Sequence, residues 1–258
     1  MPALVEISGM HFRYGKAGGR VPAAWTLPDL SLDISADSTL GIVGESGSGK
    51  STLVRVACGL LRHQEGRVAF DGREIDDWLK SSPKDLRRRN QIVFQSPRRS
   101  LDPRMSIRRA LAQPVRALER RVPTDAEMVE WLARVGLGGE ILPRFPHQLS
   151  GGQLQRIGIA RALSVGPDVL YADEPVSALD VSVQAQVLNL LMDVRSQLGL
   201  TLVMVSHDLG VVSRLCEEVI VLQHGVIVEA GRTSEVLADP QNPYTASLVT
   251  AARAVSLT

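Results

Sequence analysis

The apolar residues of this chain follow two patterns, and the two alternate along much of its length. Short runs that are apolar at nearly every position, residues 39–43, 169–172 and 201–205, predict strands buried on both faces of a parallel sheet. Residues 181–198 space their apolar positions three and four apart, which predicts an amphipathic helix between two of these strands. The alternation of strands and helices predicts an α/β fold.

The N-terminal part has a different pattern. Residues 4–14 and 30–34 are short apolar segments on either side of a stretch rich in glycine and proline, and they predict strands of an antiparallel portion. Residues 66–70 and 91–94 also predict strands, with a polar stretch between them. We therefore expect an antiparallel subdomain beside the parallel core.

The periodicity becomes helical between residues 106 and 135. Thr124 is followed three residues later by Glu127, the pattern of a capping box, in which each side chain bonds the other residue's backbone N–H at the start of a helix. Because this region interrupts the alternation of core strands and helices, we expect an inserted helical subdomain.

A glycine-rich loop joins the strand at residues 39–43 to a helix predicted at 52–60, and its residues are Gly44, Glu45, Ser46, Gly47, Ser48, Gly49, Lys50, Ser51 and Thr52. Strand, loop and helix are the setting of a phosphate-binding loop, in which glycines let backbone N–H groups approach phosphate oxygens. Lys50 can reach the β- and γ-phosphates, and the Ser51 hydroxyl can ligate Mg²⁺. A glycine turn with an incidental lysine is the alternative, which the flanking elements disfavour.

Two acidic residues, Asp173 and Glu174, follow the strand at 169–172, and Pro175 prevents the strand from continuing. Ligands of open α/β sheets bind at the carboxyl ends of the strands. Asp173 is therefore placed to hold Mg²⁺ through its water shell, and Glu174 to orient and deprotonate an attacking water. A solvated acidic turn is the alternative.

Two other segments carry candidate chemistry. His207 follows the strand at 201–205, so its imidazole is delivered to the same edge of the sheet, where it can bond a γ-phosphate; a structural histidine is the alternative. Leu149, Ser150, Gly151, Gly152 and Gln153 form a second turn of small residues that opens a helix and presents N–H groups to an anion. Two such turns in one chain indicate an ATPase site shared between two subunits.

In this order, the motifs resemble the nucleotide-binding subunit of an ABC transporter over nearly the whole chain. Residues 44–51 resemble the Walker A motif, Gln95 the Q-loop, 149–153 the family signature and Asp173 with Glu174 the end of Walker B. Residues 177–180 (Ser177, Ala178, Leu179, Asp180) resemble the D-loop, and His207 the switch histidine. The resemblance implies a RecA-like P-loop NTPase core with an antiparallel β subdomain and an inserted α-helical subdomain.

The resemblance also implies roles for these residues, with ATP and Mg²⁺ as cofactors. Gln95 senses Mg²⁺ and the lytic water and joins Ser51 and Asp173 as a metal contact, while Glu174, His207, Gln95 and Lys50 are the catalytic residues. Ser150 and Gly152 bind the γ-phosphate held by the partner subunit, and Gly151, Gln153 and Asp180 complete the nucleotide contacts.

One aromatic side chain of the N-terminal strand resembles the family's adenine-stacking residue. Tyr14 is the favoured candidate and Phe12 the competing one. Both fall on the same face of a strand, so their spacing does not separate stacking on a base from packing in the core.

The family resemblance predicts one nucleotide-binding domain over residues 1–258. Within it, residues 1–95 and 165–232 are expected to form the ATP-binding core, 96–164 the inserted helical and signature subdomain, and 233–258 a C-terminal helical tail.

Two stretches narrow the resemblance to the ATPases of oligopeptide, dipeptide, nickel and opine importers. They are Phe94-Gln95-Ser96-Pro97 running on to Ser100-Leu101-Asp102-Pro103-Arg104-Met105, and Asn242-Pro243-Tyr244-Thr245. The implied function is to power import through ATP-driven closure of a dimer. The implied partners are a second ATPase chain, identical or paralogous, two transmembrane permeases and, indirectly, an extracytoplasmic substrate-binding protein. The implied location is peripheral, at the cytoplasmic face of the inner membrane.

Composition agrees with this reading. The 258 residues are 44% hydrophobic and 22% charged, which suits one sizeable α/β domain, and a net charge of +1 indicates no nucleic-acid partner. Cys58 and Cys216 are far apart, so we expect neither a metal site nor the C-terminal cysteine cluster that some relatives carry beyond the position of Thr258. No apolar run approaches about 18 residues and no leader pattern opens the chain, so a soluble or peripheral protein is expected.

A basic run brackets Gln95, and its members are Lys84, Arg87, Arg88, Arg89, Arg98, Arg99, Arg104, Arg108 and Arg109. A solvated face explains most runs of this kind; a surface that meets a permease or anionic lipid is the sharper hypothesis.

Two function classes compete with import. An ATPase of a soluble complex, as in carbon–phosphorus bond cleavage, shares the same subgroup of ATPase. A DNA-maintenance ATPase is disfavoured because the segment between Gln95 and Leu149 is too short for a long coiled coil and holds no zinc-spaced cysteines.

Overall fold

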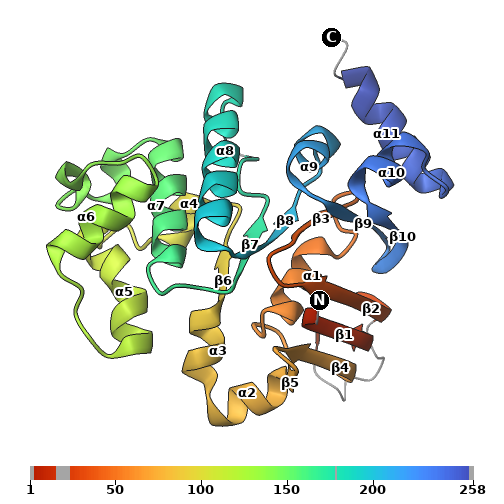
Figure 1. Cartoon of the computed structure of the whole chain (residues 1–258), viewed down its shortest axis with the longest axis horizontal. Coiled ribbons are helices and arrows are strands. Elements are labelled where there is room, and N and C mark those ends of the chain that lie inside the picture. Colours follow the sequence, from red (N-terminus) through yellow and green to blue (C-terminus); the bar gives the residue numbers. More distant parts are fainter. Residues whose placement is uncertain (1–2, 16–23, 178, 256–258) are drawn as a thin grey trace. The chain divides into compact units, whose positions relative to one another are not determined.

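The computed structural model describes residues 3–15, 24–177 and 179–255, without the side chains of Arg99 and Val255. The chain divides into two compact units (Figure 1), the first made of residues 1–83 and 201–258 and the second of residues 84–200. Within the described residues, no helix is long and apolar enough to cross a membrane.

The first unit contains an antiparallel sheet in the order β2-β1-β4-β5. Its elements are β1 (Ala3–Phe12), β2 (Leu27–Ser35), β4 (Glu65–Phe70) and β5 (Arg73–Glu74), followed by the helix α2 (Ile75–Ser81). Val5 of β1 lies opposite Phe70 of β4 and Ile34 of β2, and all three side chains are buried. These cross-strand neighbours form the core of the antiparallel portion that the short apolar segments of the N-terminal part predict.

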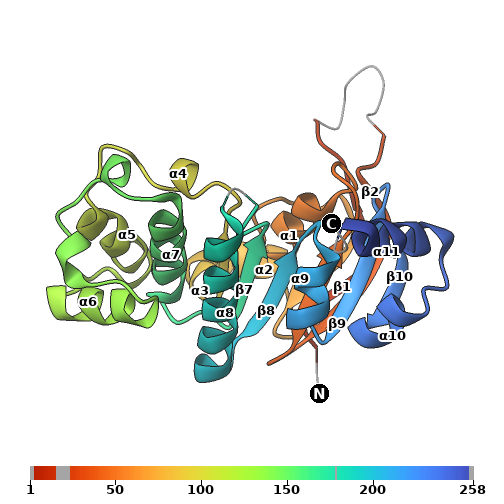
Figure 2. The same ribbon diagram turned by 90° about the horizontal axis from the view of Figure 1, so that it is seen from above.

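The same unit contains strands in the order β10-β9-β3-β8, with β3 parallel to both of its neighbours and β10 antiparallel to β9. The elements are β3 (Thr39–Val43), α1 (Lys50–Ala57), β8 (Thr201–Val205), α9 (Leu209–Leu215), β9 (Glu218–Gln223), β10 (Val226–Arg232), α10 (Thr233–Ala238) and α11 (Pro243–Val255). Every residue of β3 and β8 is buried, as expected for parallel strands covered on both faces. Figure 2 shows α10 and α11 beside β10.

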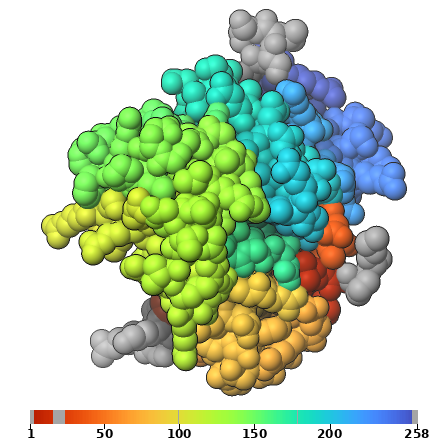
Figure 3. Space-filling model, turned by 60° about the vertical axis from the view of Figure 1, so that its left-hand side comes forward, coloured from red at the N-terminus to blue at the C-terminus, as the bar shows by residue number. Residues whose placement is uncertain are grey.

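The second unit pairs two parallel strands with a group of helices. Its elements are α3 (Pro83–Arg89), which begins at the boundary between the units, β6 (Asn90–Val93), α4 (Pro97–Ser100), α5 (Ile107–Glu119), α6 (Asp125–Arg134), two 3-10 turns (Gly139–Ile141 and Pro146–Gln148), α7 (Gly151–Leu163), β7 (Val169–Asp173) and α8 (Val181–Leu198). The helix α7 contacts α4, α5, α6 and α8, so it is the central helix of this group. Figure 3 brings forward the surface of the helical segment, coloured from yellow to green.

The helical region at residues 106–135 forms two helices because the chain turns between them. Arg120 ends α5 in the left-handed conformation, with φ of 59°. Thr124 then begins α6 with the predicted capping box, in which its hydroxyl accepts from the Glu127 N–H and the Glu127 carboxylate accepts from the Thr124 N–H.

Most predicted elements are confirmed, some of them with different bounds, such as the strand predicted at 30–34, which runs over Leu27–Ser35. The strands at 39–43 and 201–205 and the helix at 181–198 have the predicted bounds. The first strand ends at Phe12, and the helix predicted at 52–60 runs over Lys50–Ala57. The polar stretch before residue 91 contains two short helices, α2 and α3, whose few buried side chains leave little apolar periodicity.

Candidate phosphate loop and catalytic turn

The glycine-rich loop surrounds a buried cation. Lys50 is 5% exposed, and its Nζ donates hydrogen bonds of 2.7 Å to the carbonyl oxygens of Gly44 and Glu45. The Ser48 N–H donates to the Glu45 carbonyl at 3.2 Å, and the Ser48 carbonyl accepts from Gly225 at 2.8 Å. The loop therefore folds around its own lysine and is fastened to the segment after β9.

Three glycines make this path possible. Gly44, Gly47 and Gly49 have φ of 147°, 84° and 107°, a region that residues with a side chain rarely adopt. A Cβ on Gly44 would lie 2.1 Å from the Leu222 carbonyl oxygen, so the loop passes too close to β9 for any side chain there. Among the described residues, no side chain caps the start of α1, which leaves the positive end of the helix dipole to an anion.

The loop has the chemistry of a triphosphate site. Ser48 Oγ is buried without a hydrogen-bond partner among the described residues, which suits a hydroxyl directed at a ligand oxygen. Lys50 supplies positive charge at the start of α1, and Ser51 and Thr52 follow it in the first turn of that helix. These groups fit phosphate oxygens, and Ser51 is the residue of this loop that fits Mg²⁺.

The two candidate aromatic residues differ in exposure. Phe12 is 3% exposed and ends β1 in the core, whereas Tyr14 lies beyond the strand and is 49% exposed. The Tyr14 hydroxyl shares a hydrogen bond of 3.0 Å with Thr52 Oγ1. The rings of Phe12 and Tyr14 pack edge to face, with their centroids 4.9 Å apart. Tyr14 is therefore the residue with a surface to offer a ligand at the phosphate loop.

His207 belongs to the same unit as the loop. It is exposed between Ser206 and Asp208, where the Asp208 carboxylate caps α9 by accepting from the N–H groups of Gly210 and Val211. His207 and Gly44 line one pocket of about 230 Å³, so the predicted switch histidine and the start of the phosphate loop are neighbours.

The acidic turn of the second unit is built around Glu174. Asp173 ends β7 and is 3% exposed, while Glu174 takes a left-handed conformation with φ of 47°. The Gln95 Nε2 donates to the Glu174 carboxylate at 2.7 Å and to Ser177 Oγ at 3.2 Å. A non-glycine residue in this conformation is strained, and such strain concentrates at functional sites. The turn thus brings Gln95 onto the predicted catalytic base.

The signature turn begins α7 with a second capping box. Ser150 Oγ accepts from the Gln153 N–H at 3.2 Å, and the Gln153 side chain accepts from the Ser150 N–H at 3.0 Å. A Cβ on Gly151 would lie 3.3 Å from Leu179 Cδ2, and one on Gly152 would lie 2.5 Å from Val183 Cγ1. The signature glycines therefore let α7 pack closely against the segment that leads into α8.

Asp180 is the residue before α8, and its carbonyl accepts from the N–H groups of Val183 and Gln184. Ala178, also part of the predicted D-loop, lies outside the described residues.

Each unit thus gathers its own set of predicted site residues. The first unit holds the loop at residues 44–52 with Tyr14 and His207, and the second holds Gln95, Asp173 and Glu174 together with the signature turn. Sequence reasoning missed two contacts: Ser177 on Gln95, and the hydroxyl of Tyr244, which accepts from the Glu45 N–H at 2.9 Å. The second lies in a stretch that the sequence singled out only as a mark of subgroup.

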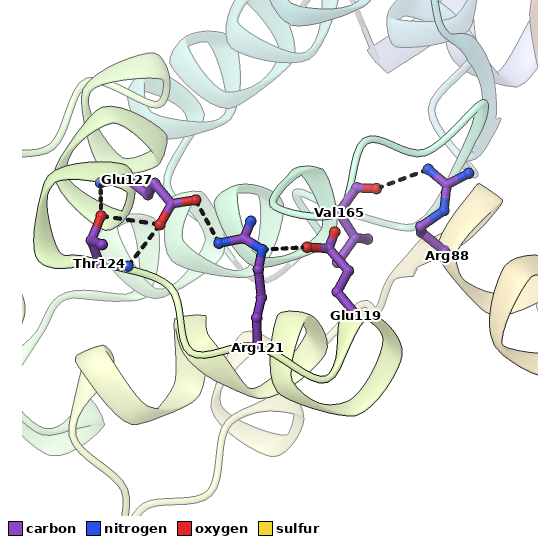
Figure 4. Close-up of polar contacts among 6 residues, drawn as sticks. All are labelled: Arg88, Glu119, Arg121, Thr124, Glu127 and Val165. Carbon is purple, nitrogen blue, oxygen red and sulfur yellow. Dashed lines mark hydrogen bonds and ion pairs between the residues drawn. The ribbon is translucent and has the colours of Figure 1, made fainter.

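Part of the basic run has structural partners. Arg88 Nη1 donates to the carbonyl oxygen of Val165 at 3.4 Å (Figure 4) and to that of Gly166 at 3.4 Å. Arg89 forms an ion pair of 2.5 Å with Asp168. Arg108 pairs with Asp125. The run is therefore not a uniform solvated face, while Arg98 and Arg104 are exposed and the side chain of Arg99 lies outside the described part of the chain.

Comparison with known proteins identifies the class of this site. Residues 27–177 match the family model described as ABC transporter. A putative peptide import ATP-binding protein of Brucella ovis is 45% identical over 229 residues, which cover 87% of this chain and 72% of that protein. The oligopeptide transport ATP-binding protein OppF of Haemophilus influenzae is 43% identical over 227 residues, 86% of this chain and 68% of OppF.

Solved structures show the same fold at lower identity. CbiO1 of Clostridium perfringens, part of the ABC transporter complex CbiONQ, superposes with a TM-score of 0.78 at 28% identity and covers 92% of this chain and 91% of that chain. The ATP-binding cassette MJ0796, a dimer in a post-hydrolysis state with ADP and Pi, gives a TM-score of 0.76 at 28% identity and covers 89% and 98%. The predicted ABC ATPase fold is thereby confirmed.

Proposed function

The chain is an ATPase of the ABC transporter family, and from that premise we propose that it powers peptide import through partner permeases. The observation that carries the proposal is the relatedness at 43–45% identity to ATP-binding proteins of peptide import, over 86–87% of this chain. The alternative, an ATPase of a soluble carbon–phosphorus lyase-like complex, receives no support from these relatives.

The proposed nucleotide site uses both sets of residues. Residues 44–52 bind the phosphates, Tyr14 stacks on adenine, and Asp173 with Ser51 and Gln95 holds Mg²⁺, which neutralises charge on the phosphates when bound. The buried Lys50 supports the assignment of the loop, as does the Ser48 hydroxyl, which is buried without a hydrogen-bond partner in the part of the chain that the structure describes.

The proposed hydrolysis depends on position and charge more than on covalent chemistry. Glu174 orients the attacking water and accepts its proton, Gln95 holds the Glu174 carboxylate in place, and His207 bonds the γ-phosphate. The hydrogen bond of 2.7 Å from Gln95 to Glu174 supports this division of roles.

In the proposed transport cycle, two such subunits close on each other when ATP binds, and this closure drives transport. Ser150 and Gly152, with Gly151, Gln153 and Asp180 beside them, then contact the γ-phosphate held by the partner, and hydrolysis reopens the dimer. The dimeric state of the structural relative MJ0796 supports dimerisation of this chain. In this scheme the chain works at the cytoplasmic face of the membrane, as an ATP-binding core, an inserted helical subdomain and a C-terminal tail.

The experiment that tests the proposal is affinity purification of a tagged copy from native membranes in mild detergent, with and without ATP. Two multi-span permeases are the expected partners, with or without a second ATPase chain. Recovery only from the soluble fraction, bound to enzymes that lack membrane spans, would replace import by the soluble-complex reading and leave the residue roles unchanged.

A second arm tests the substrate class. Cells that lack the chromosomal copy receive either the wild-type chain or Glu174→Gln, and uptake of a labelled oligopeptide is measured. Uptake restored by the wild-type chain alone supports peptide import. Equal uptake with and without the wild-type chain would exclude that peptide class.

A further inference from the structure

The stretch Asn242-Pro243-Tyr244-Thr245 forms the start of α11 and is tied to β10 through Glu229. The Glu229 carboxylate accepts from the N–H groups of Gln241 at 2.8 Å and Asn242 at 3.1 Å. Burial acts to raise the pKa of Glu229, but the neighbouring Thr245 side chain and the hydrogen bonds from these two N–H groups outweigh it and lower the pKa. The carboxylate thus stays ionised and anchors the chain just before the helix.

Asn242 sets the direction of the helix. Its Oδ1 accepts from the Tyr244 N–H at 2.9 Å, and its Nδ2 donates to the Val228 carbonyl oxygen at 3.4 Å. A side-chain oxygen that bonds the backbone two residues on forms a turn at the helix start, and Pro243 favours that position. With both ends of the turn held, the following side chain has a defined direction.

That side chain is Tyr244, which reaches the phosphate loop. Tyr244 as a residue is half-buried, and its hydroxyl accepts from the Glu45 N–H at 2.9 Å in a solvent-exposed hydrogen bond. The carbonyl of the preceding residue, Gly44, belongs to the same peptide group and accepts from Lys50 Nζ at 2.7 Å. Since the N–H and C=O of a trans peptide point in opposite directions, this one peptide is held on both sides.

The peptide needs such support because of its neighbour. Gly44 has φ of 147°, and because glycine has no Cβ, steric clashes do little to restrict the rotation of its backbone. Rotation of the Gly44–Glu45 peptide would turn the carbonyl away from Lys50 and remove the hydrogen bond that this carbonyl accepts from the ammonium group. The tyrosine hydroxyl opposes this rotation.

Residues of α11 and of the phosphate loop also line one pocket together. The pocket of about 230 Å³ has Gly44, His207 and Leu209 among the residues on one side and Leu248, Ala251 and Ala252 of α11 on the other. The C-terminal helix therefore borders both the loop and the predicted switch histidine.

We infer that Tyr244 is a positioning residue of the ATP site, which orients the Gly44–Glu45 peptide so that Lys50 is held ready for the nucleotide phosphates. The inference rests on the proposed role of residues 44–52 as the phosphate site. It gives the stretch at 242–245 a function: the stretch fastens the C-terminal helix to β10 and directs one hydroxyl at the phosphate loop.

The test is Tyr244→Phe, which removes the hydroxyl and keeps the ring. The Kd for Mg²⁺–ATP of the full chain, measured by titration, is expected to rise about three- to tenfold for one lost hydrogen bond. In the complex, KM for ATP is expected to rise by the same factor with kcat unchanged, because the residues of the acidic turn are untouched.

Thr250→Ala is the matched control, since it also removes a hydroxyl from α11, one that bonds only the Ala246 carbonyl within the helix. Both variants are compared at a temperature where circular dichroism shows each to be folded. Hydrogen exchange of residues 44–47 is expected to be faster in Tyr244→Phe alone.

Wild-type Kd and wild-type exchange of the loop in Tyr244→Phe would overturn the inference, as would equal changes in the Thr250→Ala control. Failure of the wild-type chain to bind ATP would overturn the proposed phosphate site as well. The two failures are therefore distinguishable.

Discussion

Two helices of this protein begin at turns of small residues, and the two turns differ in how their N–H groups are satisfied. At the start of α1, positive-φ glycines lead into Lys50, and within the described part of the chain no side chain caps the helix. At the start of α7, Ser150 and Gln153 cap each other. Both helix N-termini carry the positive end of a helix dipole. Of the two, only the N-terminus of α1 has no capping side chain among the described residues.

Because of this difference, the two turns are expected to contact a phosphate in different ways. The turn before α1 is shaped in advance around Lys50, so a nucleotide finds donors already oriented. In the turn before α7, the Ser150 oxygen already accepts from the Gln153 N–H, so the hydroxyl is fixed by its own helix while its O–H can still donate to the γ-phosphate of a partner. In the proposed dimer, the first turn binds ATP and the second responds to closure.

Glu174→Gln tests the largest effect, because it leaves both turns intact and removes only the base. Turnover is expected to fall by a factor of about 10² to 10⁴, while Mg²⁺–ATP still binds and accumulates a closed dimer. Phosphate release and size-exclusion chromatography with ATP measure the two outcomes. Wild-type turnover would refute the role of Glu174.

Gly44→Ala tests whether the first turn is shaped by its backbone. The new Cβ would collide with the Leu222 carbonyl at 2.1 Å and occupy a left-handed φ, so a loss of about 2–5 kcal/mol in the free energy of unfolding is expected. Gly47→Ala is the control, since it shares the positive φ but meets nothing within 4 Å; strain alone predicts about 1–2 kcal/mol. Urea unfolding of both variants measures the free energy of unfolding and so separates the effect of the steric collision from that of backbone strain. Equal losses in the two variants would show that the collision with Leu222 contributes nothing.

Ser150→Ala tests whether the second turn does more than cap. Loss of an N-cap hydroxyl should lower the free energy of unfolding by about 1 kcal/mol. Thr124→Ala removes the equivalent cap of α6, away from any proposed ligand, and is expected to cost the same. Only Ser150→Ala should also reduce turnover, by about 10- to 100-fold for a lost bond to a charged phosphate. Equal turnover in the two variants would make Ser150 a cap and nothing else.

Glu127→Gln tests the smallest effect, the charge in the capping box of α6. The Thr124 N–H, then Arg121 and the Thr124 hydroxyl, lower the pKa of Glu127 (Figure 4). A lowered folded pKa means that this stabilisation is present above the ordinary pKa of a glutamate and is lost as pH falls through the folded value. The variant should therefore be slightly less stable than wild type at neutral pH, and the difference should shrink as pH falls below the ordinary glutamate pKa of about 4.3 and disappear below the lowered folded pKa.

The capping box at Ser150, whose side chains are uncharged, is the control for the pH dependence of Glu127→Gln. The stability deficit of Ser150→Ala is expected to change little over the same pH range, since neither Ser150 nor Gln153 titrates. Melting temperatures of both variants and the wild type between neutral and acidic pH make the comparison. A deficit of Glu127→Gln that does not depend on pH would show that its charge is irrelevant to the cap.

Several features were predictable because they depend on local chemistry. The runs at 39–43 and 201–205 are apolar at nearly every position, and a strand buried on both faces requires this. The capping box at Thr124 lies within four residues, so its pattern is visible without a partner from elsewhere. The helices α2 and α3 were not predicted, because short elements with few buried side chains leave a weak periodic signal. The strands β9 and β10 were not predicted either, although residues 219–222 of β9 form a buried apolar run.

The sequence by itself determined the chemistry of this protein: a glycine loop with Lys50, an acidic pair after a buried strand, and a signature turn, in the order of one ATPase family. Tertiary structure alone decided which distant groups meet: the Gln95 amide and the Glu174 carboxylate, 79 positions apart, and the Tyr244 hydroxyl and the Glu45 backbone N–H, 199 positions apart. It also separated the buried Phe12 from the exposed Tyr14. The physical reason is that residue type and spacing specify local hydrogen bonds, whereas contacts between distant segments depend on how strands and helices pack.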